Sequence, residues 1–134
     1  MLDIALQIGK RISHSISVVS PELTADAAVR AAIIAEFPDI ARRDWLSQVI
    51  LMYNDPDLLR ERRRIDSQIE IMAATAIAAR QGMDETIEIY PRLVAATMIA
   101  TVHVAIQHWL NTETEEGFRE TLTQVLDRVS IAHC

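Results

Sequence analysis

The chain has 134 residues, half of them hydrophobic and 24% charged, and its formal net charge is −6 at pH 7. This length suits one domain with its own core, and the composition excludes disordered and fibrous proteins. The negative charge opposes binding of a polyanion over the surface as a whole. The one cysteine, Cys134, has no partner for a disulfide within the chain, so we expect a single domain over residues 1–134 in the reducing cytoplasm.

Two helices are predicted before the first long polar stretch. Isoleucines recur every four residues from Ile4 to Ile16, which makes one apolar stripe on a helix that Ser20-Pro21 ends. Thr24 is a plausible N-cap for a second, alanine-rich helix that Pro38 stops.

The middle of the chain predicts a short helix and then a long one. Asp44 can cap the short helix, which runs to Tyr53. Asp55 can cap the next helix, and Pro56 fits its first position because the N–H that proline lacks would be unpaired there. This helix runs to Gln81, and Gly82 is its expected C-terminal stop.

The last third predicts two further helices. Asp84 can start the next segment, which Pro91 either kinks or restarts, and the stretch from Leu93 to Leu110 is apolar almost all round. Such a helix must be covered on more than one side, yet its apolar run is too short to span a bilayer. A capping box at Thr112 and Glu115 precedes a narrow apolar seam up to Ala132. We therefore predict an all-α bundle of five to six helices.

No motif for catalysis or metal binding is present in the sequence. There is no HExxH, no Glu-x-x-His pair, no GxSxG and no Gly-rich phosphate loop. His103 and His108 point about 140° apart on a helix, so they cannot share a metal ion. The basic run from Arg60 to Arg64 is interspersed with acids and is interpreted as a solvated helix face. We expect no enzyme activity, no metal and no cofactor.

From Asp44 onward the chain resembles the C-terminal domain of the TetR/AcrR family of transcription regulators. The resemblance lies in DPDLLRERR at the start of a long helix, the RQGMDE break, the PRLVAATMIATVHVAIQHWL helix and a final amphipathic helix after a short polar loop. It implies that the last two helices pair with their copies in a four-helix bundle and that the preceding helices enclose an effector pocket. Residues 1–43 then supply the linking and first pocket helices, residues 44–110 the core helices, and residues 111–134 the dimerisation helix.

The resemblance implies an effector-binding and dimerisation domain of a repressor that senses a small, largely apolar ligand. Family members read DNA through an N-terminal helix-turn-helix domain, and nothing before Asp44 resembles one. The chain is either a fragment of a longer regulator or a relative that lost its DNA reader, and DNA contact would need a domain not present here. The alternative is a structural helical module that binds a protein partner and has no ligand or DNA role.

The predicted site residues come from helix faces. Few polar groups among apolar and methionine side chains are typical of a small-molecule pocket, although such residues are more often plain core. The ligand-binding residues predicted in this way are Trp45, Val49, Ile69, Met72, Thr97, Met98, Thr101 and His103. The interface of the predicted homodimer comprises Val94, Val102, Ile106, Trp109, Phe118, Leu122, Val125 and Val129.

Overall fold

The computed structural model describes residues 2–37, 42–84, 86–112 and 117–129. Within these residues the chain forms six helices, as the all-α prediction requires. They are α1 (Leu2–Val18), α2 (Ala25–Glu36), α3 (Arg42–Asn54), α4 (Pro56–Gln81), α5 (Tyr90–Asn111) and α6 (Phe118–Leu126).

Three predicted helix ends are confirmed by their hydrogen bonds. The Thr24 hydroxyl accepts from the backbone N–H of Ala27 at 3.1 Å and caps α2. The Asp55 carboxylate accepts from the N–H groups of the first turn of α4, directly before Pro56. Gly82 ends α4 with φ of 65°, a left-handed conformation that costs glycine little.

Two other predicted helix starts are wrong. The carboxylate of Asp84 accepts from the N–H and hydroxyl of Thr86 in a turn, and α5 begins only at Tyr90 with Pro91 in its first turn. Thr112 is the C-cap of α5, and its hydroxyl donates to the carbonyl of His108, so it does not cap the last helix. The short side chains of Asp and Thr hydrogen-bond to nearby backbone groups in turns and at both ends of helices. The sequence alone therefore does not show which of these places they occupy.

The boundaries of α3 and α6 also differ from the prediction. α3 begins at Arg42, two residues before the predicted cap Asp44. α6 starts after Gly117, and Glu115 of the predicted capping box lies outside the described residues. α6 ends at Leu126. The predicted apolar seam continues to Ala132, but only its residues up to Val129 lie within the described part of the chain.

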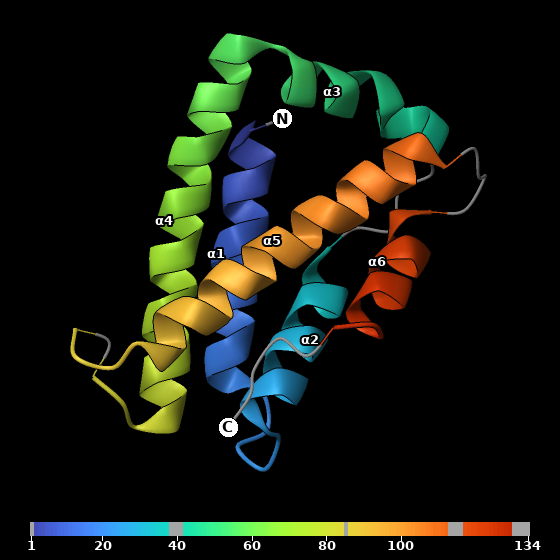
Figure 1. The fold of residues 1–134 in the computed structure, drawn as a ribbon. Coiled ribbons are helices and arrows are strands. Elements are labelled where there is room, and N and C mark those ends of the chain that lie inside the picture. Colours follow the sequence, from blue (N-terminus) through green and yellow to red (C-terminus); the bar gives the residue numbers. More distant parts are fainter. Residues whose placement is uncertain (1, 38–41, 85, 113–116, 130–134) are drawn as a thin grey trace.

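The helices pack around α1. In Figure 1, α1 and α4 run side by side in the same direction, and α5 crosses both diagonally. α2 packs against the lower part of α1, α6 lies against α5 and α2, and α3 closes the upper end across α4 and α5. The short turn at Gly82 and the loop before Tyr90 let α5 fold back over α4.

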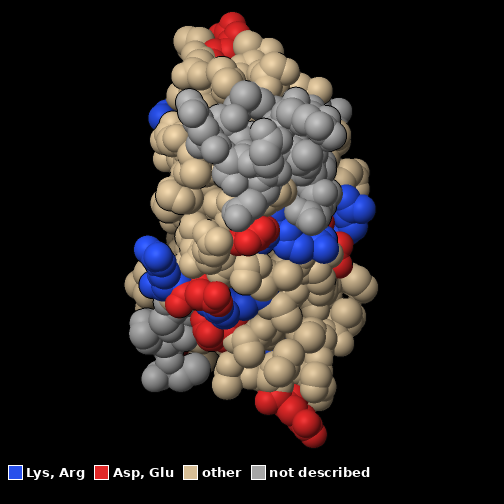
Figure 2. Space-filling model, turned by 90° about the vertical axis from the view of Figure 1, so that its right-hand side faces the viewer, with Lys and Arg blue, Asp and Glu red and all other residues tan. Residues whose placement is uncertain are grey.

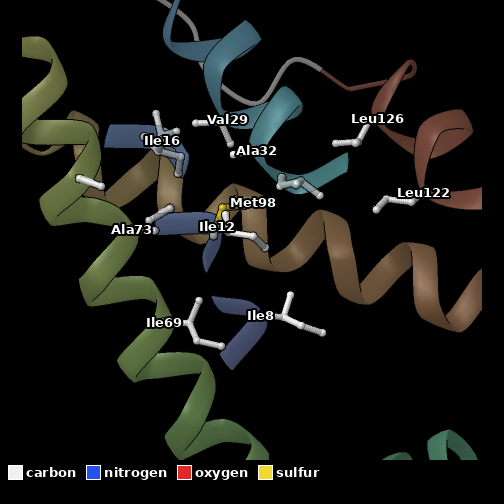
Figure 3. Close-up of a cluster of buried hydrophobic side chains, with 14 of the residues drawn as sticks. Ile8, Ile12, Ile16, Val29, Ala32, Ile69, Ala73, Met98, Leu122 and Leu126 are labelled. Atoms are coloured by element: carbon white, nitrogen blue, oxygen red, sulfur yellow. The ribbon is translucent and has the colours of Figure 1, made fainter. Parts of the chain in front are cut away.

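The core is mostly aliphatic and lies chiefly between α1, α2, α4, α5 and α6. Figure 3 shows Ile8, Ile12 and Ile16 of α1 surrounded by side chains of the other four helices. Ile16 is completely buried, which confirms the predicted stripe, whereas Ile4 at its start is 46% exposed. Alanines at closely packed positions of α2 and α4, such as Ala32 and Ala73, let these backbones approach α1.

Candidate functional site

A partly open cavity lies between α1, α3, α4 and α5. Its volume is about 110 Å³, and most of its wall is apolar. Gly9 forms part of the wall that α1 contributes. A Cβ at this position would lie 2.5 Å from Cγ1 of Ile69 on α4, so only glycine fits without moving that side chain. The apolar lining residues besides Gly9 are Ile4, Ala5, Ile8, Ile12, Phe37, Val49, Met52, Ile69, Met98, Ile99, Val102, Ile106, Trp109 and Phe118.

An aromatic cluster lines the cavity where α5 and α6 meet. The Phe118 ring packs edge to face against Phe37 and Trp109, with ring centroids 5.5 Å and 5.4 Å apart. Trp109 is 1% exposed and Phe118 is 4% exposed. The contacts of these rings make this wall of the cavity aromatic.

The polar lining residues gather where α3, α4 and α5 face one another. His103 of α5 contacts both of its neighbours: Nε2 lies 2.8 Å from Oδ2 of Asp66, and Nδ1 is hydrogen-bonded to the hydroxyl of Tyr53. Burial raises the pKa of Tyr53 to about 12, although the positive charge of Arg62 opposes this rise. The phenol is therefore protonated near neutral pH, and in the tautomer in which it donates to Nδ1, the Nε2–H of His103 donates to Asp66.

Arg62 of α4 completes this polar corner, which we define as Tyr53, Arg62, Asp66 and His103. Its guanidinium carbon lies 4.0 Å from the centre of the Tyr53 ring, a cation–π contact. Its Nε and Nη1 are shielded from solvent and have no hydrogen-bond partner among the described residues. The prediction that the whole run from Arg60 to Arg64 is a solvated face is wrong for Arg62, because this position of α4 turns toward the cavity and its neighbours do not.

Only some of the eight predicted ligand-binding residues line the cavity. Val49, Ile69, Met98 and His103 line the cavity together. Met72 packs against the core elsewhere, and Thr97 and Thr101 face the other side of α5, where their hydroxyls donate to the carbonyls four residues earlier. The side chain of Trp45 lies outside the described residues.

The predicted interface residues also lie in different parts of the structure. Val94, Trp109, Phe118 and Leu122 are buried inside the chain, and Val102 and Ile106 line the cavity. Val125 and Val129 are half-buried at the edge of an open hollow between α5 and the end of α6. This α5–α6 hollow is lined by Thr97, Ala100, Thr101, Val104, His108, Gln124, Val125, Asp127, Arg128 and Val129.

Sequence reasoning missed the cavity residues of α1 and three members of the polar corner. Tyr53, Arg62 and Asp66 are ordinary surface residue types, and only their register relative to α5 brings them to His103. One signal was present in the sequence: Arg62 and Asp66 are four residues apart on α4 and flank its apolar positions Ile65 and Ile69.

Comparison with known protein families finds a match to the MftR C-terminal domain, one of the TetR C-terminal domain families, over residues 22–133. A search of curated proteins finds no match. The family match covers most of the chain, and the six described helices agree with it. The chain therefore belongs to the TetR family of regulators as a C-terminal, effector-binding and dimerisation domain.

Proposed function

We propose that this domain senses a small, largely apolar effector in the cavity between α1, α3, α4 and α5. The observation that carries the proposal is the cavity itself: apolar walls from four helices surround a single polar corner. Burial of apolar ligand surface contributes about 25 cal/mol per Å² while a few polar groups fix the orientation. Because α1 and α5 both line the cavity, a ligand there would alter the packing of helices that are far apart in the sequence.

We further propose that the domain forms a homodimer through the α5–α6 hollow. Domains of this family generally dimerise. The uninterrupted apolar run was expected to be too short to span a bilayer, but α5 as a whole is long and apolar enough by length and composition alone. Only 33% of its most apolar stretch is buried within the chain. A second copy seated on Val104, Val125 and Val129 would cover the open face, which suits the two-fold pairing of identical patches in a dimer.

We also propose that the regulator is a cytoplasmic repressor. Its contact with DNA would come from a helix-turn-helix domain and not from these helices. The net charge is −6. On the face shown in Figure 2, basic and acidic side chains alternate, and most of the described surface is uncharged. This distribution offers no basic stripe on that face for a phosphate backbone to follow.

Thermal unfolding against a panel of small apolar compounds tests the sensing proposal. A ligand that binds only the folded state raises the unfolding midpoint as its concentration rises. Ala5→Phe should abolish that response, because it places a ring in the cavity, and Ala31→Phe on the exposed face of α2 is the matched control.

The alternative function, a structural module that binds a protein partner, predicts a different result. No panel compound would shift the midpoint of the wild type. Equal shifts in the wild type and in Ala5→Phe would also contradict the proposal, since they would place the ligand outside the cavity.

A further inference from the structure

We infer that the effector carries an anionic group, with a carboxylate as its simplest form, and that Arg62 binds this group at the polar corner. The inference rests on the proposed function and names the chemical class of its ligand. It starts from the contrast between Arg62 and the other three members of the corner.

The arginines around Arg62 on α4 are exposed or paired. Arg64 forms an ion pair with Glu61, Arg60 lies 4.0 Å from Asp57, and Arg63 is exposed to water. Only Arg62 in this run turns into the cavity, where two of its guanidinium nitrogens are shielded and unpaired among the described residues. Arg62 contacts Tyr53 through its ring face and through a side-chain hydrogen bond, but Nε and Nη1 of its guanidinium have no partner among the described residues.

The hydrogen-bonding groups beside Arg62 are already engaged with one another. The Tyr53 hydroxyl and Oδ2 of Asp66 both bind His103, on its two ring nitrogens. Asp66 follows Arg62 by one helical turn, yet no ion pair joins the two side chains. The corner thus holds one satisfied chain of three groups and one cation whose shielded donors lack acceptors.

Two shielded N–H groups without acceptors are costly, and an anion that supplies two acceptor oxygens removes that cost. The guanidinium is a planar fork that matches the two oxygens of a carboxylate. The rest of the cavity is apolar and small, since its 110 Å³ is less than the roughly 150 Å³ of an engineered cavity that takes up benzene. These features describe a short apolar body with one anionic end.

Calorimetric titration of the full chain with three matched six-carbon probes tests this inference. Hexanoate and hexanamide share a pentyl body, hexylamine has one methylene more, and the three differ in the charge of the polar end. We expect hexanoate to bind roughly tenfold to a hundredfold more tightly than hexanamide, as a charge-assisted hydrogen bond would produce, and hexylamine to bind most weakly.

Substitutions at Arg62 assign the preference to its side chain. Arg62→Gln should remove the preference for hexanoate over hexanamide, Arg62→Lys should keep part of it, and the exposed neighbour Arg63→Gln should leave it unchanged. The unfolding midpoint of ligand-free Arg62→Gln shows whether the variant is folded. We expect it to equal or exceed that of the wild type, because two shielded N–H groups that lack acceptors are removed.

The outcomes separate this inference from the proposed function. Equal binding of hexanoate and hexanamide, or preference for hexylamine, would overturn the anion inference and leave an apolar effector site standing. The same holds if neutral panel compounds bind in the cavity and hexanoate does not. If neither these probes nor any panel compound binds, the anion inference and the sensing proposal both fall.

Discussion

Tyr53 shows how one buried polar residue makes the stability of the domain depend on pH. Burial raises the pKa of its phenol from 10.0 to about 12, against the opposing charge of Arg62. A raised pKa means that the folded state holds the proton more tightly than the unfolded state does. The resulting stabilisation is fully present below pH 10 and is lost as the pH rises toward 12.

We therefore predict that the free energy of unfolding falls by about 2 to 3 kcal/mol more between pH 10 and pH 12 in the wild type than in Tyr53→Phe. Near neutral pH, Tyr53→Phe should itself cost about 1 to 3 kcal/mol, since Nδ1 of His103 loses its partner. Urea unfolding of both proteins across this pH range measures both effects. Parallel pH profiles would show that the phenol ionises as freely in the folded protein as in the unfolded chain.

At the scale of single residues, the sequence predicted which types of residue would line a pocket. It predicted only some of the individual residues that line the cavity. Val49, Ile69, Met98 and His103 were predicted and do share the cavity. Thr97 and Thr101 were assigned to the same predicted pocket as His103, yet they lie on the other side of α5. Because α5 is apolar nearly all round, its sequence cannot indicate which face meets α4 and which face remains open.

Arginine side chains join the ends of helices that are distant in the sequence. Arg80, near the end of α4, donates to the carbonyls of Val19 at 3.0 Å and Leu23 at 2.8 Å, and to that of Ser20. These carbonyls follow the C-terminal end of α1, where a cation is also favoured by the helix dipole. Arg30 of α2 binds the carbonyls of Leu126 and Val129 at the end of α6 in the same manner.

We predict that Arg80→Met destabilises the domain by about 2 to 3 kcal/mol, because several charge-assisted hydrogen bonds to the end of α1 are lost together. Arg63→Met on the exposed face of α4 should change the stability by less than about 0.5 kcal/mol and is the matched control. Urea unfolding compares the two variants. A similarly small change in the free energy of unfolding of both variants would contradict this prediction. It would show that water replaces Arg80 at these carbonyls without loss of stability.

The helices themselves were more predictable than their ends. Their existence follows from apolar periodicity, and the caps at Thr24, Asp55 and Gly82 follow from local chemistry. The predictions at Asp84 and Thr112 failed because an acceptor or hydroxyl serves a turn or the end of a helix equally well. The bonds of Arg80 and Arg30 depend on tertiary packing, so no local pattern could indicate them.

The proposed dimer is a property of the whole molecule. Val104 on α5 is 54% exposed, and Val125 on α6 is half-buried on the same hollow. We predict that Val104→Glu combined with Val125→Glu converts the dimer to monomer, since four carboxylates would meet across a two-fold axis. Ile71→Glu, at a residue 56% exposed on α4, should leave the dimer intact.

Light scattering coupled to size-exclusion chromatography measures the mass of all three proteins. A stable dimer of the double variant would contradict the proposed interface. A monomeric wild type would contradict the dimer itself.

At the largest scale, the all-α fold and the family were predictable because helix order, helix length and the breaks between helices persist when individual contacts vary. The role of residues 1–18 was only partly predictable. They were expected to be a linking helix, but α1 also forms a wall of the cavity through Ile8, Gly9 and Ile12. That placement results from the packing of α1 beside α4, which joins residues about sixty positions apart.

The central claim, that a small effector binds between α1, α3, α4 and α5, is tested most directly by the methionine methyl groups in NMR spectra. Met52 and Met98 line the cavity, whereas Met72 and Met83 lie elsewhere. On titration with hexanoate, or with the tightest-binding panel compound, the methyl signals of Met52 and Met98 should shift progressively. Those of Met72 and Met83 should stay nearly unchanged. Shifts confined to Met83, or no shift of any methionine during saturable binding, would place the ligand outside the cavity and contradict the account.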